Sequence, residues 1–320
     1  MRTITLEEHF ITESFVHATG DAPRFAQLQP KLLDLGAGRI ADMDEAGIDL
    51  QVLSLVSMGF DALDAATATA LAHDVNDELA DAVRAHPNRL AGFAMVALKD
   101  ANAAAAELAR CVTRLGFAGA LVDGTTEGLF LDDPRFLPFF EAAAHLNVPV
   151  YLHPAPPPDP VRQTYFSGLP GDLGLLLSIA GWGWHAETGL HTLRLIVSGL
   201  FDRFPTLQLI IGHMGEGLPY ALARSSGILS QAAPHLRQPV AAYFQSNIHI
   251  TTSGYFTPQP FRCALDVVGL NRLLFSVDYP FSANTRGRTF LNSLADMLSA
   301  EDLAKLAHGN AESLLRLQPS

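Results

Sequence analysis

Residues 148–153 read Val148-Pro-Val-Tyr-Leu-His153, a short apolar run that stops at a histidine. Similar runs stop at His213, in residues 207–213, and at Asp278, in residues 273–278. Near the start of the chain, Ile4-Thr-Leu is followed by Glu7-Glu8-His9. Short apolar runs of this kind are typical of buried parallel strands. Because the carboxyl ends of parallel strands meet on one face, these four runs predict a shared site.

The whole chain alternates short β-rich runs with longer Ala/Leu-rich runs, which indicates repeated βα units and a parallel sheet. We expect eight strands, at residues 3–6, 50–56, 90–96, 119–122, 148–152, 207–211, 244–251 and 273–277. We expect helices at residues 61–85, 101–115, 134–145, 187–201 and 218–231. Eight units predict an α/β fold of the (β/α)8 TIM-like barrel type, and an open doubly wound sheet is the alternative. No GxGxxG or GxxxxGK[ST] motif follows an expected strand, so we expect no nucleotide cofactor.

Composition limits the class of protein. The 320 residues are 48% hydrophobic and 17% charged, which excludes a disordered chain. A net charge of −12 argues against nucleic acid as a partner, and no apolar run is long enough for a membrane span. The two cysteines, Cys111 and Cys263, cannot form a disulfide framework, and no signal peptide is recognisable. We expect one domain over residues 1–320 and a cytoplasmic location, with the Pro-rich stretch 154–160 as a stiff loop at the barrel mouth.

The polar residues at the strand ends have the chemistry of a metal site. Glu7 and His9 are two residues apart, so in a strand their side chains point to the same face. His153 can add a third ligand from across the barrel, and Asp278 a fourth. A glutamate, two histidines and an aspartate suit zinc, and also manganese or iron. Each residue taken alone has a plainer interpretation, an exposed strand end or a hydrogen-bonded structural histidine.

A second pair lies in Gly212-His-Met-Gly-Glu216, where Glu216 can contact a ring nitrogen of His213 and fix its tautomer. The alternative is a helix-entry turn in which Glu216 is favourable near the helix start. The only lysines are Lys31, Lys99 and Lys305, and none directly ends an expected strand. We therefore expect neither a Schiff-base lysine nor a bridging carboxylated lysine, and a single metal rather than two.

Two further features have open interpretations. Arg224 follows His213 by eleven residues and can clamp a substrate carboxylate or simply be solvated on the surface. Trp182 and Trp184 precede an amphipathic stretch, where aromatic residues more often pack or form a subunit contact than line a catalytic site.

In series, the motifs of this chain resemble those of the amidohydrolase superfamily, in its amidohydrolase 2 or ACMSD-like branch. The resemblance extends over nearly the whole chain, and within the branch it is greatest to decarboxylases of hydroxybenzoates such as γ-resorcylate and 2,3-dihydroxybenzoate. The motifs that carry it are Leu6-Glu-Glu-His-Phe10, Tyr151-Leu-His-Pro154, Gly183-Trp-His-Ala-Glu-Thr188, Phe201-Asp-Arg-Phe-Pro205, Ile211-Gly-His-Met-Gly-Glu216, Ser276-Val-Asp-Tyr-Pro-Phe281 and Gly309-Asn-Ala311.

The resemblance implies roles for individual residues and partners. The expected metal ligands are Glu7, His9, His153 and Asp278, holding one divalent ion, zinc or manganese. His213 and Glu216 match the catalytic pair, and Arg224 and Phe281 match positions near an aromatic acid substrate. It also implies a homodimer or homotetramer. The chain departs from the pattern in Ala120-Leu-Val-Asp-Gly124, where those decarboxylases typically have Asn before the glycine, and in the loops after this strand and after His153.

The resemblance implies non-oxidative decarboxylation in which Asp278 protonates the ring before CO2 leaves. That step needs a proton-bearing Asp278, so we expect a raised pKa there, by burial or by a neighbouring carboxylate such as Glu7. Tyr279 and Phe281 are expected to pack on the ring. The alternative is hydrolysis of a lactone or amide by metal-activated water, and a third interpretation is a barrel that binds a metal or small acid without turnover.

Overall fold

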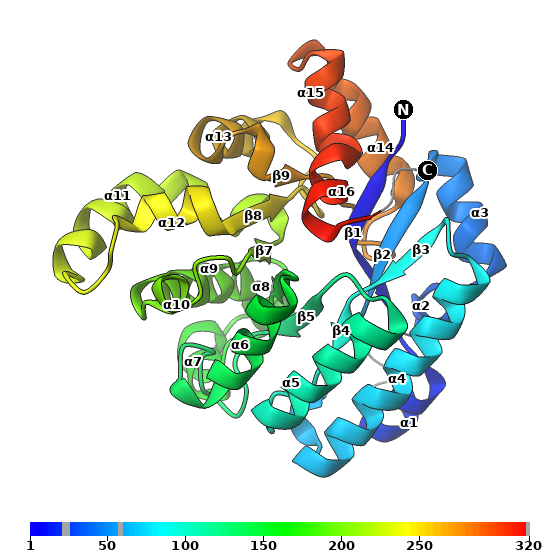
Figure 1. The fold of residues 1–320 in the computed structure, drawn as a ribbon, viewed down its shortest axis with the longest axis horizontal. Coiled ribbons are helices and arrows are strands. Elements are labelled where there is room, and N and C mark those ends of the chain that lie inside the picture. Colours follow the sequence, from blue (N-terminus) through cyan, green and yellow to red (C-terminus); the bar gives the residue numbers. More distant parts are fainter. Residues whose placement is uncertain (21–25, 57–59, 318–320) are drawn as a thin grey trace.

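The computed structural model describes residues 1–20, 26–56 and 60–317. Its strands run in chain order around a centre, with the helices outside them (Figure 1). The strands are β1 (Ile4–Phe10), β2 (Leu50–Leu55), β3 (Leu90–Gly92), β4 (Ala94–Met95), β5 (Ala120–Asp123), β6 (Val150–His153), β7 (Leu209–Ile211), β8 (Ile248–Thr251) and β9 (Leu273–Leu274).

The helices fill the connections between strands, as right-handed βα crossovers require. The α-helices are α1 (Glu13–Thr19), α2 (Gln29–Leu33), α3 (Ala37–Ala46), α4 (Ala65–Ala85), α5 (Ala101–Arg110), α6 (Leu137–Leu146), α7 (Asp159–Phe166), α8 (Leu173–Ser178), α9 (Gly183–Val197), α10 (Leu200–Arg203), α11 (Leu218–Ala232), α12 (Val240–Asn247), α13 (Pro258–Val268), α14 (Asn284–Ser293), α15 (Ala300–Ala304) and α16 (Asn310–Leu315). Shorter helical turns are η1 (Phe60–Ala62), η2 (Cys111–Leu115), η3 (Pro134–Phe136), η4 (His213–Gly215), η5 (Leu270–Arg272), η6 (Leu294–Asp296) and η7 (Lys305–Gly309).

All strand pairs are parallel and join neighbours in the chain. One sheet has the order β1-β2-β3 and the other the order β4-β5-β6-β7-β8-β9. The sheets meet at Phe93, whose N–H donates to the carbonyl of Leu53, while the next residue, Ala94, donates to Gly119. The α/β class with parallel sheets, arranged around one centre as in a TIM-like barrel, is therefore confirmed.

Side chains join β1 to the segment that follows β9. The hydroxyl of Ser276 accepts hydrogen bonds from the N–H groups of Leu6 and Glu7, at 3.1 and 2.8 Å. The carboxyl group of Glu8 in turn accepts from the N–H groups of Val277 and Tyr279, each at 3.0 Å. Complete burial raises the pKa of Glu8 to about 8, even though these donors lower it. The first and last strands are thus connected through a buried serine and a buried glutamate.

The strands lie between two apolar layers, one inside the ring of strands and one outside it. The inner layer fills the centre of the ring and includes Leu6, Val52, Phe93, Tyr151 and Ile210. The outer and larger layer lies between the strands and the helices. Residues of the strands therefore face either the centre or the helices, and the polar side chains of the candidate site lie toward the carboxyl ends of the strands.

Several element boundaries differ from those expected. The first strand continues to Phe10, so Glu7 and His9 belong to the strand itself. The expected strand 244–251 is wrong in its first half, because α12 extends to Asn247 and only Ile248–Thr251 pairs with a neighbour. The last strand is shorter than residues 273–277, since the backbone N–H groups of Ser276 and Val277 donate to the side chains of Thr252 and Glu8. The Pro-rich stretch leads directly into α7, which was not expected.

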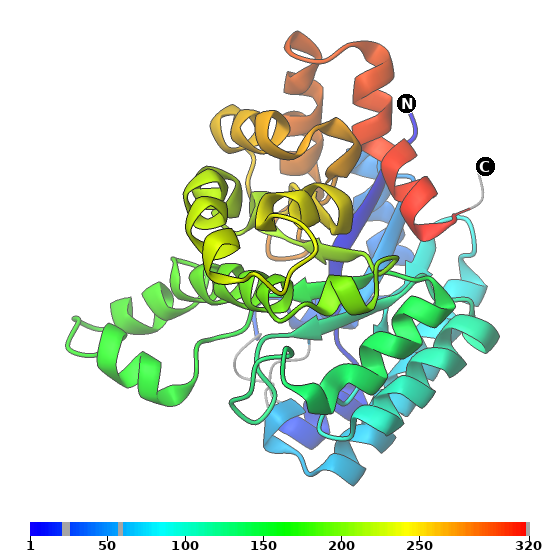
Figure 2. The same ribbon diagram turned by 60° about the vertical axis from the view of Figure 1, so that its left-hand side comes forward.

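Figure 2 shows that α7 and α8, in green, project from the side of the barrel. Trp182 follows α8 and is 63% exposed. Within the described residues, no helix combines the length and apolar character that spanning a membrane would require.

Candidate metal centre and active site

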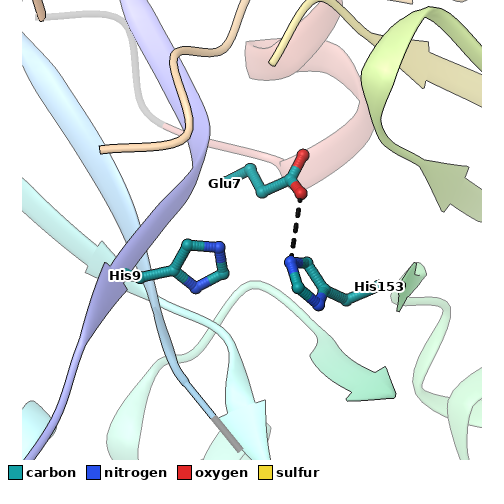
Figure 3. Close-up of side chains that lie close together, drawn as sticks. All are labelled: Glu7, His9 and His153. Atoms are coloured by element: carbon teal, nitrogen blue, oxygen red, sulfur yellow. Dashed lines mark ion pairs between the residues drawn. The ribbon is translucent and has the colours of Figure 1, made fainter. Parts of the chain in front are cut away.

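The polar side chains expected at the strand ends meet in the structure at the barrel mouth. Glu7 and His9 come from β1 and His153 from the last position of β6. One ligand atom from each of the three lies within 4.8 Å of the other two. Figure 3 shows the carboxylate and the two imidazoles pointing toward one another, with Glu7 and His153 joined as an ion pair. Asp278 lies beside them, with Oδ1 3.4 Å from Nε2 of His9.

The two oxygens of Glu7 have different surroundings. Oε2 accepts hydrogen bonds from the hydroxyls of Tyr151, Ser253 and Thr251. Oε1 is buried but has no hydrogen-bond partner among the described residues, and lies 3.3 Å from Nε2 of His153. A buried carboxylate oxygen without a donor is costly unless a cation compensates it. One oxygen is therefore anchored to the barrel while the other is left for a ligand.

Both imidazoles present Nε2 to the same space. Nδ1 of His153 is 2.9 Å from Oδ1 of Asp123. Since a carboxylate only accepts, this contact places the proton on Nδ1 and leaves the lone pair of Nε2 facing inward. Nδ1 of His9 is 3.4 Å from the hydroxyl of Ser54, and its Nε2 is buried without a hydrogen-bond partner.

This donor set fits a divalent cation. The buried Oε1 of Glu7 and Nε2 of His9, neither with a partner among the described residues, are the atoms a metal ion would engage. Two imidazole nitrogens with one or two carboxylate oxygens suit zinc, manganese or iron. Glu7, His9 and His153 could hold such an ion, with Asp278 at its edge.

A chain of hydrogen bonds runs from this cluster to α9. Nδ1 of His213 is 2.8 Å from Oε1 of Glu216, and Oε2 of Glu216 is 2.6 Å from Nδ1 of His185. Nε2 of His185 accepts from the indole N–H of Trp184 at 3.1 Å. Because the carboxylate of Glu216 only accepts, Nδ1 of His185 carries the proton that is donated to it. Nε2 of His213 then faces Glu7 and Asp278, 3.8 Å from each carboxylate.

The charges in this chain are strongly coupled. Burial alone would lower the pKa of His213, but the carboxylates of Glu7, Glu216 and Asp278 raise it well above the usual 6.5. Burial would raise the pKa of Asp278, but the nearby imidazoles of His213 and His9 outweigh burial and lower the pKa to about 2. The expectation of a raised pKa at Asp278 is therefore wrong in this geometry. Two imidazoles surround the carboxylate, and they stabilise its charge more than burial destabilises it.

The backbone that carries these groups is strained. His213, Met214 and Glu216 have φ of 50, 55 and 55°, and Asp278 has φ of 73°. Residues with side chains rarely adopt this left-handed region, and such conformations persist where the surrounding structure imposes them. In η4 they turn the side chains of His213 and Glu216 toward each other directly after β7.

The other residues singled out from the sequence lie as follows. The ring of Phe281 is 42% exposed and packs edge-on against His9, with centroids 5.6 Å apart. Arg224 is exposed on α11 and makes no hydrogen bond or ion pair with the other site residues in the described parts of the chain. Tyr279 faces away from the expected ring position, since its hydroxyl donates to Asp42 at 2.6 Å and Arg39 lies over its ring. Lys99 donates to the carbonyls of Asp61 and Leu63.

A cavity of about 580 Å³ opens beside the cluster. Asp123, the hydrogen-bond partner of His153, is one of its lining residues. The loops after β5 and β6, in which the sequence departs from the family pattern, supply much of the remaining wall, including Thr125, Thr126 and Pro156. Cavities of several hundred Å³ are typical of small-molecule sites.

The sequence did not reveal the orienting roles of several site residues, among them Tyr151, Asp123 and His185. Tyr151 lies two residues before His153 and therefore faces the same side of β6, a signal that could have been used. Asp123 ends β5 as His153 ends β6, and the two are register partners. His185 lies in the motif Gly183–Thr188, but no spacing rule connects it to Glu216, which it reaches from the first turns of a helix.

The fold and the site define a (β/α) barrel with a candidate metal centre at its mouth. A family model described as amidohydrolase (Amidohydro_2) matches residues 29–317. The chain is 38% identical over 327 residues to Decarboxylase orsB of Emericella nidulans, covering 98% of this chain and 97% of that protein. It is 37% identical over 328 residues to gamma-resorcylate decarboxylase of Polaromonas sp. strain JS666, covering 98% of each.

A solved dihydroxybenzoic acid decarboxylase from Polaromonas sp. JS666, with bound manganese and the inhibitor 2-nitroresorcinol, has the same fold. The TM-score is 0.91 at 35% identity, covering 100% of this chain and 98% of that structure. The chain therefore belongs to the amidohydrolase family, as its motifs predicted, and these relatives are decarboxylases.

Proposed function

We propose that this protein is a metal-dependent decarboxylase that removes the carboxyl group of a hydroxybenzoate-like acid without oxidation. One observation carries the proposal. In a chain matched over 98% of its length by decarboxylases, the buried Oε1 of Glu7 and Nε2 of His9 converge without partners among the described residues. A barrel that only bound small acids would need neither two buried ligand atoms without partners nor a separate hydrogen-bonded acid–base pair such as His213 and Glu216.

The proposed metal site takes one divalent ion on Glu7, His9, His153 and Asp278. Manganese is the first candidate, because the Polaromonas structure contains it, and zinc fits the same donors. When bound, the ion would act as a Lewis acid and a template for the carboxylate and the adjacent phenolic oxygen of the substrate. Tyr151 and Asp123 would hold Glu7 and His153 in place through Oε2 and Nδ1.

The proposed proton path uses Asp278, His213 and Glu216. With a pKa of about 2, Asp278 is ionised near neutral pH and must first receive a proton. The neighbouring imidazolium of His213, held at Nδ1 by Glu216, is positioned to supply it from Nε2. Asp278 then gives the proton to the ring carbon that bears the carboxylate. The carbon–carboxylate bond breaks, its electron pair restores the aromatic ring, and CO2 leaves.

The remaining substrate contacts follow from position. Phe281 would pack against the ring of the substrate, since it already covers His9 at the mouth. Arg224 would contribute a peripheral contact only if the substrate or a second copy of the chain brings an anion to α11. The family resemblance also supports a homodimer or homotetramer in the cytoplasm, and light scattering after size-exclusion chromatography measures the oligomer.

The test is to load the protein with manganese or zinc, offer it a panel of 2-hydroxybenzoates, and measure CO2 release. We expect release with one or a few members, lost on chelation and restored by the metal. Asp278→Asn should abolish turnover, and metal content should be measured alongside to separate loss of chemistry from loss of the ion. Silence across the panel with metal bound, together with hydrolysis of a lactone or amide, would replace decarboxylation by the hydrolase alternative.

A further inference from the structure

A second polar cavity lies at the opposite end of the barrel from the metal centre, with a volume of about 480 Å³. Its walls are built at the amino ends of β6, β7, β8 and β9 and on α16. Its polar lining includes Gln208, His249, Arg272 and Arg316. Catalytic sites of such barrels lie at the carboxyl ends of the strands, so the proposed decarboxylation leaves this cavity without a role.

The charge of this cavity is opposite to that of the whole molecule. Among the described residues, its lining contains two arginines and no aspartate or glutamate, in a chain with a net charge of −12. Arg272 is partly buried, and burial is the only cause that lowers its pKa, with no carboxylate acting to raise it. Arg316 is exposed at the rim, and its side chain makes no hydrogen bond or ion pair within the described ranges. A partly buried guanidinium without a counter-charge is unfavourable unless an anion from outside compensates it.

Hydrogen bonding leaves one edge of Arg272 free. Its Nη1 donates to Oε1 of Gln208 at 2.8 Å and to Nε2 of His249 at 2.9 Å. Nε and Nη2 make no hydrogen bond with any described residue. These two N–H groups form the planar fork that binds the two oxygens of a carboxylate, phosphate or sulfate.

His249 adds to the excess of donors. Because a guanidinium has no acceptor, Nε2 of His249 must accept from Arg272, and the ring proton is then on Nδ1. Nδ1 is buried and has no partner among the described residues. Burial and the charge of Arg272 lower the pKa of His249 to about 3, so the imidazole is neutral. Gln208 and His249 therefore hold Arg272 in place through neutral acceptors, and neither of them brings a negative charge to the cavity.

We propose that this cavity is a binding site for a small oxyanion, held by the Nε–Nη2 edge of Arg272 and by Arg316. The class comprises inorganic dianions and small organic carboxylates, which share the paired oxygens that the fork recognises.

The first experiment titrates the metal-loaded protein with sodium sulfate in a calorimeter, with chloride holding the ionic strength constant. Sulfate stays a dianion at all working pH values and is a weak metal ligand. We expect one saturable site per chain, unchanged after chelation of the metal. We expect binding to weaken about 10-fold or more in Arg272→Gln and by a smaller factor in Arg316→Gln.

Arg237→Gln is the matched control, because Arg237 is also exposed, its side chain makes no contact that the described residues reveal, and the charge change is the same. Arg316→Gln keeps the test valid if Arg272→Gln fails to fold. The side chain of Arg316 is exposed and has no contact among the described residues, so its replacement should not affect folding. Equal affinity in wild type and both cavity variants, an equal loss in Arg237→Gln, or no saturable binding at all would overturn the proposal. Competition by succinate distinguishes the source: tighter binding of succinate identifies an organic acid, and tighter binding of sulfate an inorganic anion.

Discussion

The two carboxylate oxygens of Glu7 leave no room for a side chain at Gly212, the residue before His213. A Cβ built on Gly212 would lie 2.7 Å from Oε2 and 3.1 Å from Oε1 of Glu7. Contacts this short force a neighbour to move, and Glu7 is held between three hydroxyls and the cluster. The absence of a side chain at position 212 is therefore what allows the carboxylate to occupy the centre of the mouth.

Gly212→Ala should therefore displace Glu7 and weaken metal binding by about 10- to 100-fold, the range typical for groups that orient metal ligands. Metal content after dialysis and the CO2-release rate should fall together, while the thermal unfolding of the metal-free protein changes little. Gly227→Ala is the control, since a Cβ there meets nothing within 4 Å. Full metal occupancy in Gly212→Ala would show that Glu7 is not a ligand.

His185 acts on the reaction through Glu216. Burial raises the pKa of Glu216, but His213 and the hydrogen bond from His185 lower it more. In His185→Phe the pKa of Glu216 should rise, so Glu216 takes up a proton at a higher pH than in wild type. The acid limb of the pH profile of kcat should shift to higher pH, with kcat lowered about 10-fold or more.

Metal content should stay unchanged in His185→Phe, because His185 contacts none of Glu7, His9 and His153. His145→Phe, at an exposed position of α6, should leave the profile in place. If kcat falls but the acid limb of its pH profile does not shift, His185 contributes to packing and not to the protonation of Glu216.

At the scale of elements, α9 supports two parts of the mouth. Its first turns carry Trp184 and His185 toward Glu216, and its middle carries His191. Nε2 of His191 accepts from the N–H of Leu131 at 2.8 Å, which fixes the end of the loop after β5. The same helix thus orders the proposed acid–base pair and one wall of the loop region that distinguishes this chain from its relatives.

His191 should make stability fall with acidity. Burial lowers its pKa to about 4, from the usual 6.5. Below pH 6.5 the unfolded chain binds a proton that the folded chain refuses until about pH 4, so stability falls over that window, by up to about 3 kcal/mol. His191→Gln keeps an acceptor for the N–H of Leu131. It should make the unfolding free energy less dependent on pH, by the equivalent of up to one bound proton. Urea unfolding at pH 7.5, 6 and 4.5 measures it, and equal slopes in variant and wild type would contradict the assignment.

At the scale of the molecule, the metal site connects distant parts of the chain. Its candidate ligands come from β1, from β6 and from the segment after β9. An ion that binds the folded protein alone stabilises it by RT ln(1 + [L]/Kd), about 4 kcal/mol at 1,000 times Kd. Chelation should therefore lower Tm by several degrees, and manganese should restore it. Calorimetry on Glu7→Gln supplies the comparison: a Tm that still responds to chelation as strongly as wild type would place the ion elsewhere.

The sequence alone determined the repeating βα pattern and the positions of the four polar strand ends. Both follow from local rules, because a buried parallel strand must be apolar and must end where polar residues reach solvent. It indicated Glu7 and His9 as neighbours on one face, since strand geometry alternates side chains. The resemblance of its motifs added the family and the decarboxylase relatives, which the comparisons confirmed.

Only the tertiary structure decided how the site is held and charged. Ser253 and His185 reach Glu7 and Glu216 from separate elements, and no spacing rule brings these partners together. The sequence also could not show whether the pKa of Asp278 is raised or lowered. Burial and two imidazoles act on it in opposite senses, and only the distances decide which prevails. The strand at 244–251 was misjudged because residues 244–247, Phe-Gln-Ser-Asn, belong to α12, whose packing against α11 and α9 outweighs local β propensity.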